Sequence, residues 1–360
     1  MKKFNVTGLC TPEEDYMVDI SDKIVQIKKM IDNESYFTIQ KPPKYGKTTM
    51  LTTLKSALKD DYTVISINFG QFGADCFESS DKFYQEFVKQ AAESLRNSCR
   101  DNEYIEKWES YIPRRLSTLD DHIEEMCEGR KVVLMVDDAD INSRNEVFLD
   151  FLATLRQQYT ERKADKGSAF HSVIIASVYD IKNIWLTVPN YYAPWNIAAD
   201  FRVDMSFSPV EITIMLKDYE ADHNTGMNIT EISEEIYRHT SGYPFLVSRV
   251  CEVIDECLDK NWTLSGVQKA VKQILAENNP VFDNITLNLE EDEELYKLIC
   301  RVLDPDNFIS FNHNYYVMSL AYTIGIIKRK GNGSDRAIIP NKIFEEFLYD
   351  YTVPKDRVIK

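Results

Sequence analysis

A turn that ends in Gly46-Lys47-Thr48-Thr49 carries the residue types best suited to chemistry in this chain. A glycine lets the backbone approach a phosphate closely, a lysine can reach the outer phosphates of a nucleotide, and a threonine hydroxyl can ligate Mg²⁺. The turn follows an apolar stretch and opens a helical pattern, and a helix N-terminus attracts anions through its free N–H groups and its dipole. The turn therefore predicts a site for a metal-bound triphosphate; the alternative is an ordinary exposed helix start.

The turn departs from the full phosphate-binding pattern, G-x-x-x-x-G-K-[ST], at its first position, where Lys41 replaces the glycine. Pro42 and Pro43 cannot donate an N–H group, but the donors in the second half of such a loop do most of the phosphate binding. Lys41 and Lys44 add positive charge beside the expected triphosphate. We expect Lys47 to act in catalysis as well as in binding. The expected nucleotide contacts in the loop are Lys41, Lys44, Tyr45, Gly46, Lys47, Thr48 and Thr49.

Two adjacent carboxylates, Asp137 and Asp138, end a continuous apolar run over 132–136. Such a run is typical of a central parallel strand that is covered on both faces. An apolar strand ending in aspartate resembles a Walker B element, in which Asp137 would hold Mg²⁺ together with Thr48. Asp138 would then polarise the attacking water. Many ATPases of this division have glutamate at the second position, so the reach of the shorter Asp138 is an open question.

Strands that alternate with helices must position these residues. The strands are expected over 36–39, 63–69, 132–136, 171–178 and 201–207, with an all-helical insertion at about 72–130. This order predicts a parallel α/β sheet, and ligands of such sheets bind beyond the carboxyl ends of the strands. A polar residue at the end of the fourth strand would sense the γ-phosphate, and either Ser177 or Tyr179 could fill that role.

The composition changes after residue 207. A helical region runs over 208–278, and the last part, 279–360, combines helices, one of them across 290–294, with a hairpin around 331–333 and a final helix. Helices followed by a hairpin resemble a winged helix. The basic residues of the hairpin could contact nucleic-acid phosphates or could simply be solvated: Lys328, Arg329, Lys330 and Arg336. Near the N-terminus, Tyr16 or Met17 could cover a nucleotide base, or could be a core residue.

The charge balance is acidic, with 58 Asp and Glu against 42 Lys and Arg and a formal net charge of -16. This balance disfavours a broad nonspecific nucleic-acid surface. Neither a signal peptide nor an uninterrupted apolar segment of about 18 residues is visible, and the seven cysteines lack zinc-ligand spacing. We expect a cytoplasmic protein with no membrane partner.

Several segments together resemble the bacterial AAA-like ATPases, which are STAND-related, archaeal-type ASCE P-loop NTPases. They are VTGLC, YMVD at 16–19, YFTI, YGKTT, SVIIASVYDIKNI, PWNIAADFRVDMSFSP and TSGYPFLVSRVC. The resemblance implies a P-loop domain over 1–207, a helical lid over 208–278 and a winged-helix-like domain over 279–360. It also implies that Gly242 and Pro244 match a "GxP" element that faces the nucleotide, which adds Pro244 to the expected contacts. Longer members carry a PD-(D/E)XK nuclease-like domain, for which we find no acid–lysine cluster in this sequence.

These observations predict a molecular switch that binds ATP with Mg²⁺ and hydrolyses it. The alternative is a nucleotide-binding scaffold with little turnover, which recruits a protein or DNA partner through its C-terminal part. A protein partner or a second copy of the chain fits either hypothesis, whereas DNA has weak support. No arginine finger is evident; Arg156 could be solvated or could reach a neighbouring site.

Overall fold

The computed structural model describes residues 2–112, 116–139, 145–182, 195–331 and 333–358. The chain forms two compact units, and each unit is built from more than one stretch of the sequence. One unit contains Ser21–Lys41 and Lys47–Val203, and we call it the sheet unit. The other contains Met1–Ile20, Pro42–Gly46 and Asp204–Lys360, and we call it the helical unit. Within the described ranges, no helix is both long enough and apolar enough to cross a membrane.

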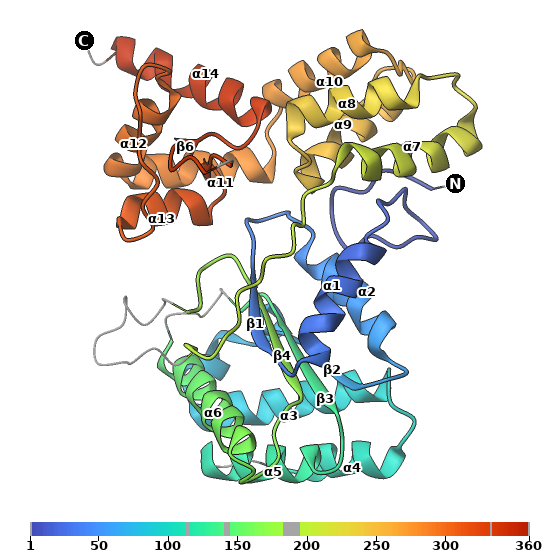
Figure 1. The fold of residues 1–360 in the computed structure, drawn as a ribbon, viewed down its shortest axis with the longest axis vertical. Helices are drawn as coiled ribbons and strands as arrows, with labels where there is room; N and C mark the ends of the chain where they lie inside the picture. The colour runs from blue at the N-terminus through green and yellow to red at the C-terminus, as the bar shows by residue number, and fades with distance from the viewer. Residues whose placement is uncertain (1, 113–115, 140–144, 183–194, 332, 359–360) are drawn as a thin grey trace. The chain divides into compact units, whose positions relative to one another are not determined.

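A four-stranded parallel sheet forms the centre of the sheet unit, in the order β1-β4-β3-β2 (Figure 1). Strand β4 therefore lies between β1 and β3, as expected of an inserted strand. Every residue of β3 and β4 is buried, which explains their continuous apolar sequences. The predicted α/β parallel sheet is confirmed. The strands are β1 (Tyr36–Gln40), β2 (Thr63–Asn68), β3 (Val132–Asp137) and β4 (Ser172–Ser177).

The prediction of a fifth strand over 201–207 is wrong. The chain instead makes an isolated parallel bridge between Ala199 and Phe37, and the Ala199 N–H donates to the Tyr36 carbonyl at 2.7 Å. Val203 and Met205 are buried, and Arg202 and Asp204 are exposed, so the period-two pattern is real. Such alternation requires one buried side of an extended segment, and it does not require a hydrogen-bonded neighbour strand.

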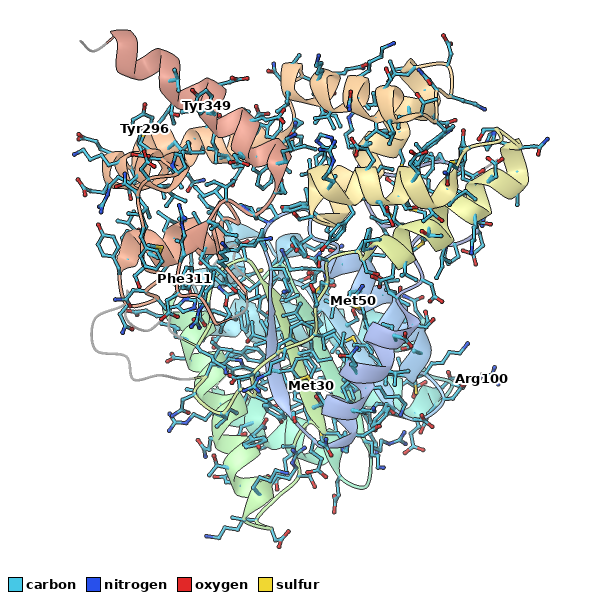
Figure 2. All side chains as sticks on the ribbon, turned by 45° about the horizontal axis from the view of Figure 1, so that its top comes forward. Met30, Met50, Arg100, Tyr296, Phe311 and Tyr349 are labelled. Carbon is cyan, nitrogen blue, oxygen red and sulfur yellow. The ribbon has the colours of Figure 1, made fainter. Side chains whose placement is uncertain are left out.

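Helices cover both faces of the sheet. The helices α1 (Ser21–Asp32) and α2 (Lys47–Leu58) lie on one face (Figure 1). Met50 of α2 is buried there (Figure 2). The opposite face is packed by an aromatic-rich core that includes Phe69 and Trp108. The elements on that face are η1 (Phe69–Gln71), η2 (Ala74–Phe77), α3 (Ser80–Arg96), α4 (Asn102–Ser110), α5 (Leu116–Cys127) and α6 (Glu146–Lys163).

The first helix of the helical unit opens with a capping box, in which Ser208 and Glu211 satisfy each other's backbone N–H groups. Asp292 separates two of its helices, because its backbone is extended and its carboxylate caps the second helix at Leu295. The expected single helix across 290–294 is therefore wrong. The helices are α7 (Pro209–His223), α8 (Ile229–Thr240), α9 (Pro244–Cys257), α10 (Leu264–Ala276), α11 (Pro280–Glu291), α12 (Glu293–Leu303), α13 (Tyr316–Thr323) and α14 (Lys342–Val358).

A short antiparallel hairpin, β5 (Lys328–Arg329) and β6 (Ala337–Ile338), lies between α13 and α14. Near it, Phe311 packs edge-to-face against Tyr322 of α13 (Figure 2). The N-terminal segment also belongs to this unit. Tyr16 is buried there, and its hydroxyl donates to Asp222 at 2.8 Å. Tyr16 is therefore a core residue and is not available to cover a nucleotide base.

Candidate active site

The two predicted metal ligands lie together at the carboxyl edge of the sheet. The Thr48 hydroxyl, in the first turn of α2, donates a hydrogen bond of 2.7 Å to Asp137 Oδ2 at the end of β3. The two residues are 89 positions apart in the chain. Strand β1 leads into the loop before α2, so the parallel sheet brings the start of this helix and the end of β3 to the same edge.

Asp137 is a buried carboxylate, with 6% of its surface exposed. Burial raises the pKa of the Asp137 carboxyl, the hydrogen bond from Thr48 opposes this shift, and the adjacent Asp138 charge reinforces it. A cation bound here would relieve both the burial cost and the repulsion between the two acids. Mg²⁺ prefers hard oxygen ligands and uses one or two carboxylates with substrate phosphates. A carboxylate and a hydroxyl in contact therefore fit the ion.

Lys47 is also buried at this edge, and its ammonium group donates to the Lys41 carbonyl at 3.0 Å. The Lys41 N–H in turn donates to the Ser177 carbonyl at 3.2 Å, which ties the start of the loop to the end of β4. Lys41 thus contributes its backbone to the site. The ammonium group of Lys47 must leave this carbonyl, or share it, in order to contact a phosphate.

The second acid, Asp138, has a left-handed backbone, with φ at 51°. Its N–H donates to Asp137 Oδ1 at 3.0 Å, and its Oδ2 accepts a hydrogen bond of 2.9 Å from the Asn68 side chain. Aspartate and asparagine adopt this backbone region more readily than residues with longer side chains. The conformation therefore provides a physical reason for aspartate where glutamate is usual.

Asn68 is a site residue that the sequence analysis missed. It ends β2 opposite Asp137 in the strand register, and its side-chain oxygen accepts the Gly70 N–H at 2.6 Å. That contact fixes the orientation of the amide, so its NH₂ group points toward Asp138. Its position in the sequence could have identified it, because it lies at the end of the second predicted strand, at the same edge of the sheet as the two acids.

The two sensor candidates differ in burial. Ser177 ends β4, between β1 and β3, and is fully buried; its hydroxyl has no hydrogen-bond partner within the described part of the chain. Tyr179 is 41% exposed. A buried hydroxyl without a partner is costly, and a ligand at this edge could supply one.

The loop segment Pro42–Gly46 packs within the helical unit. Gly46 has φ at 78° and Lys44 has φ at 59°, so the loop contains two left-handed residues. The Lys44 ammonium donates to the Val6 carbonyl at 3.4 Å, and the Tyr45 ring packs edge-to-face on Tyr243. The side chains of Lys44 and Tyr45 are therefore both in contact with other residues of this chain.

Two further residues were expected to contact the nucleotide. Thr49 follows Thr48 in α2 and is partly exposed, and Pro244 opens α9 and is buried.

The basic residues of the β5–β6 hairpin are largely engaged within the protein. Arg329 pairs with Asp335, and Arg336 donates to the carbonyls of Pro305 and Asn307. Lys328 is partly buried, and burial lowers the pKa of its ammonium group. Lys330, the remaining basic residue of the hairpin, is exposed.

Comparison with known proteins places the chain in a fold and a family. The Walker-type ATPase PABY2304 of Pyrococcus abyssi has a TM-score of 0.62 and 11% identity, over 96% of this chain and 99% of that chain. The Aeropyrum pernix ORC2 protein in its ADP form has a TM-score of 0.47 and 11% identity, over 98% and 97%. The first likeness shows the fold alone, and the second is too weak to carry an argument. No curated protein sequence matches the chain.

A family model described as an AAA-like domain matches residues 18–350. The match covers nearly all of the sheet and the helices described above, and it confirms the resemblance to AAA-like ATPases. The family match supports ATP binding and makes the chain a candidate ATPase. By this match, the chain belongs to the AAA-like domain family.

Proposed function

We propose that the protein binds Mg²⁺-ATP at the carboxyl edge of its sheet and hydrolyses it as a STAND-type switch. The observation that carries this proposal is the 2.7 Å contact between the Thr48 hydroxyl, at the start of α2, and the buried Asp137 carboxylate, at the end of β3. In a switch of this kind, the conformation of the protein depends on whether ATP or ADP is bound. The rate of hydrolysis then sets how long the ATP-bound state lasts.

The chain's residues would divide the work as follows. Lys47 moves from the Lys41 carbonyl to the outer phosphates, and the amides around Gly46 bind the phosphate oxygens. Thr48 and Asp137 hold Mg²⁺, which when bound neutralises charge on the phosphate oxygens. Asp138 orients the attacking water. Phosphoryl transfer depends mainly on such positioning and electrostatic stabilisation.

Two polar side chains complete the arrangement. Asn68 holds the Asp138 carboxylate at 2.9 Å and so fixes the direction from which water is oriented. We assign the γ-phosphate sensor to Ser177 rather than to the exposed Tyr179, because the buried Ser177 hydroxyl lacks a partner among the described residues. A phosphate oxygen would accept its hydrogen bond.

The Lys47→Ala substitution tests the nucleotide site. We expect it to abolish measurable binding of Mg²⁺-ATP in isothermal titration calorimetry, because the phosphates lose the charge-assisted hydrogen bonds of the ammonium group. Lys59→Ala is the matched control, since Lys59 is an exposed lysine just beyond α2. We expect it to bind as the wild type does. Equal affinity of Lys47→Ala and the wild type for ATP would refute the site.

A second function, a nucleotide-dependent scaffold with little turnover, is favoured by the short acid at position 138, which is already engaged by Asn68. Turnover assays separate the two functions. An ATPase releases phosphate over many cycles, whereas a scaffold stops after about one turnover per molecule. Repeating the assay at rising protein concentration tests whether a second copy of the chain supplies an arginine to the site. Adding duplex DNA tests the other class of partner.

A further inference from the structure

We propose that Tyr243 is a positioning residue for the phosphate-binding loop, and that it fixes the loop before the nucleotide arrives. This inference rests on the proposed nucleotide site. Tyr243 lies between the two residues of the expected "GxP" element, Gly242 and Pro244, and it caps the N-terminus of α9. Its side chain contacts the loop.

Two contacts join Tyr243 to the loop. Its hydroxyl donates a hydrogen bond of 2.5 Å to the Pro43 carbonyl, across 200 positions of sequence. Its ring lies 4.8 Å from the Tyr45 ring at an interplanar angle of 70°, an edge-to-face contact. Tyr243 is only 4% exposed, and burial raises the pKa of its hydroxyl, which therefore stays protonated as a donor.

The backbone around Tyr243 is rigid. Gly242 has φ at 74°, and a Cβ atom there would lie 2.0 Å from the Phe207 carbonyl oxygen. The Phe207 N–H donates to the Gly242 carbonyl at 2.8 Å, and the Tyr243 N–H donates to the Thr240 carbonyl at 3.0 Å. The ring also packs on Phe344 of α14, with centroids 5.4 Å apart. Tyr243 is thus held on its backbone and on its ring.

The loop meets a further support at its first proline. Gly325, just after α13, has φ at 81°, and a Cβ atom there would lie 2.5 Å from the Pro42 side chain. Contacts therefore reach Pro42, Pro43 and Tyr45. They flank Lys44, whose left-handed backbone is unfavourable for a lysine without outside support. Preformed loops bind more tightly because less conformational freedom is lost on binding.

The Tyr243→Phe substitution removes the hydroxyl and keeps the ring. In the nucleotide-free protein, we expect faster hydrogen exchange at the amides of residues 44–47. For Mg²⁺-ATP, we expect a dissociation constant raised about three- to tenfold, the usual effect of losing one hydrogen bond to a buried acceptor. The turnover number at saturating ATP should stay near that of the wild type, because Tyr243 acts on the loop and not on the reacting atoms.

Tyr219→Phe is the matched control. Tyr219 is buried in the same unit, and its hydroxyl donates to Asp255 at 2.6 Å, so the substitution removes a comparable hydrogen bond. We expect it to lower the unfolding free energy without changing exchange at residues 44–47. The proposal is overturned if Tyr243→Phe matches this control in both exchange and affinity. The hydrogen-exchange measurement needs no nucleotide, so its result does not depend on the proposed function. Normal ATP binding by Lys47→Ala would overturn the proposed function but would leave the exchange result unchanged.

Discussion

Asp138 combines three constraints in one residue. Its backbone is left-handed, its N–H group binds the neighbouring Asp137, and its carboxylate binds Asn68. Glutamate would add a methylene and would adopt this backbone less readily. The local backbone therefore favours aspartate at this position, apart from its proposed role in catalysis. The amide of Asn68 holds the carboxylate in place.

At the residue scale, we predict that Asp138→Asn keeps ATP affinity within about twofold and lowers the turnover number by about 100-fold. That loss is typical for removal of a general base. Phosphate release at saturating ATP measures it. Asp165→Asn is the control, because Asp165 also has a left-handed backbone but lies exposed after α6.

A double substitution tests whether Asn68 acts through Asp138. If it does, Asn68→Ala should lower turnover alone but add little to Asp138→Asn, because residues acting as a unit are not additive. Strictly additive losses in turnover would show that Asn68 acts independently. Unchanged turnover in Asp138→Asn would remove Asp138 from the mechanism.

At the scale of elements, the turn between α8 and α9 determines where α9 begins. The Phe207 backbone can pack closely against this turn because Gly242 has no side chain. Helix α9 begins at Pro244 because proline suits the first turn of a helix. The same turn presents Tyr243 to the loop. An element boundary therefore carries both a structural and a functional constraint.

We predict that Gly242→Ala lowers the unfolding free energy by at least about 2 kcal/mol, from the left-handed backbone and the clash with Phe207. Gly226→Ala is the matched control. Gly226 has φ at 73°, but a Cβ atom there would meet no atom within 4 Å. It should cost only about 1 kcal/mol, the backbone contribution alone. Urea denaturation measures both, and equal losses would contradict the packing argument.

At the scale of the whole molecule, the net charge of -16 decides which partners are excluded by electrostatics. Duplex DNA binding depends on positive groups that replace the counterions of the phosphates. On the hairpin, Asp335 neutralises the charge of Arg329, and the guanidinium of Arg336 already donates to two backbone carbonyls.

We therefore predict no measurable binding of labelled duplex DNA at about 150 mM salt, in the range where nonspecific binders have dissociation constants of about 1–100 µM. Fluorescence anisotropy with Mg²⁺-ATP and with Mg²⁺-ADP measures it. Saturable binding that weakens steeply with salt would contradict the prediction. Lys330→Glu would then show whether the hairpin makes the contact.

Local sequence patterns were enough to predict the features of this chain that depend on neighbouring residues. A buried strand, a turn ending in Gly46-Lys47-Thr48 and a helix follow from local periodicity and from glycine's conformational freedom. The apolar strand ending in Asp137 is equally local. Because parallel strands end at one edge, these two patterns predicted the Thr48–Asp137 pairing that the structure shows.

Contacts between residues far apart in the sequence depend on how the chain packs, and local patterns did not predict them. Burial alternates over 201–205 although these residues form no strand. An alternating apolar pattern shows which side chains are buried, but it does not show whether the backbone hydrogen-bonds to another strand. The bonds from Asn68 to Asp138 and from Tyr243 to Pro43 join residues 70 and 200 positions apart. Asparagine and tyrosine are ordinary residues in many local settings, and their partners depend on how the helices and strands pack.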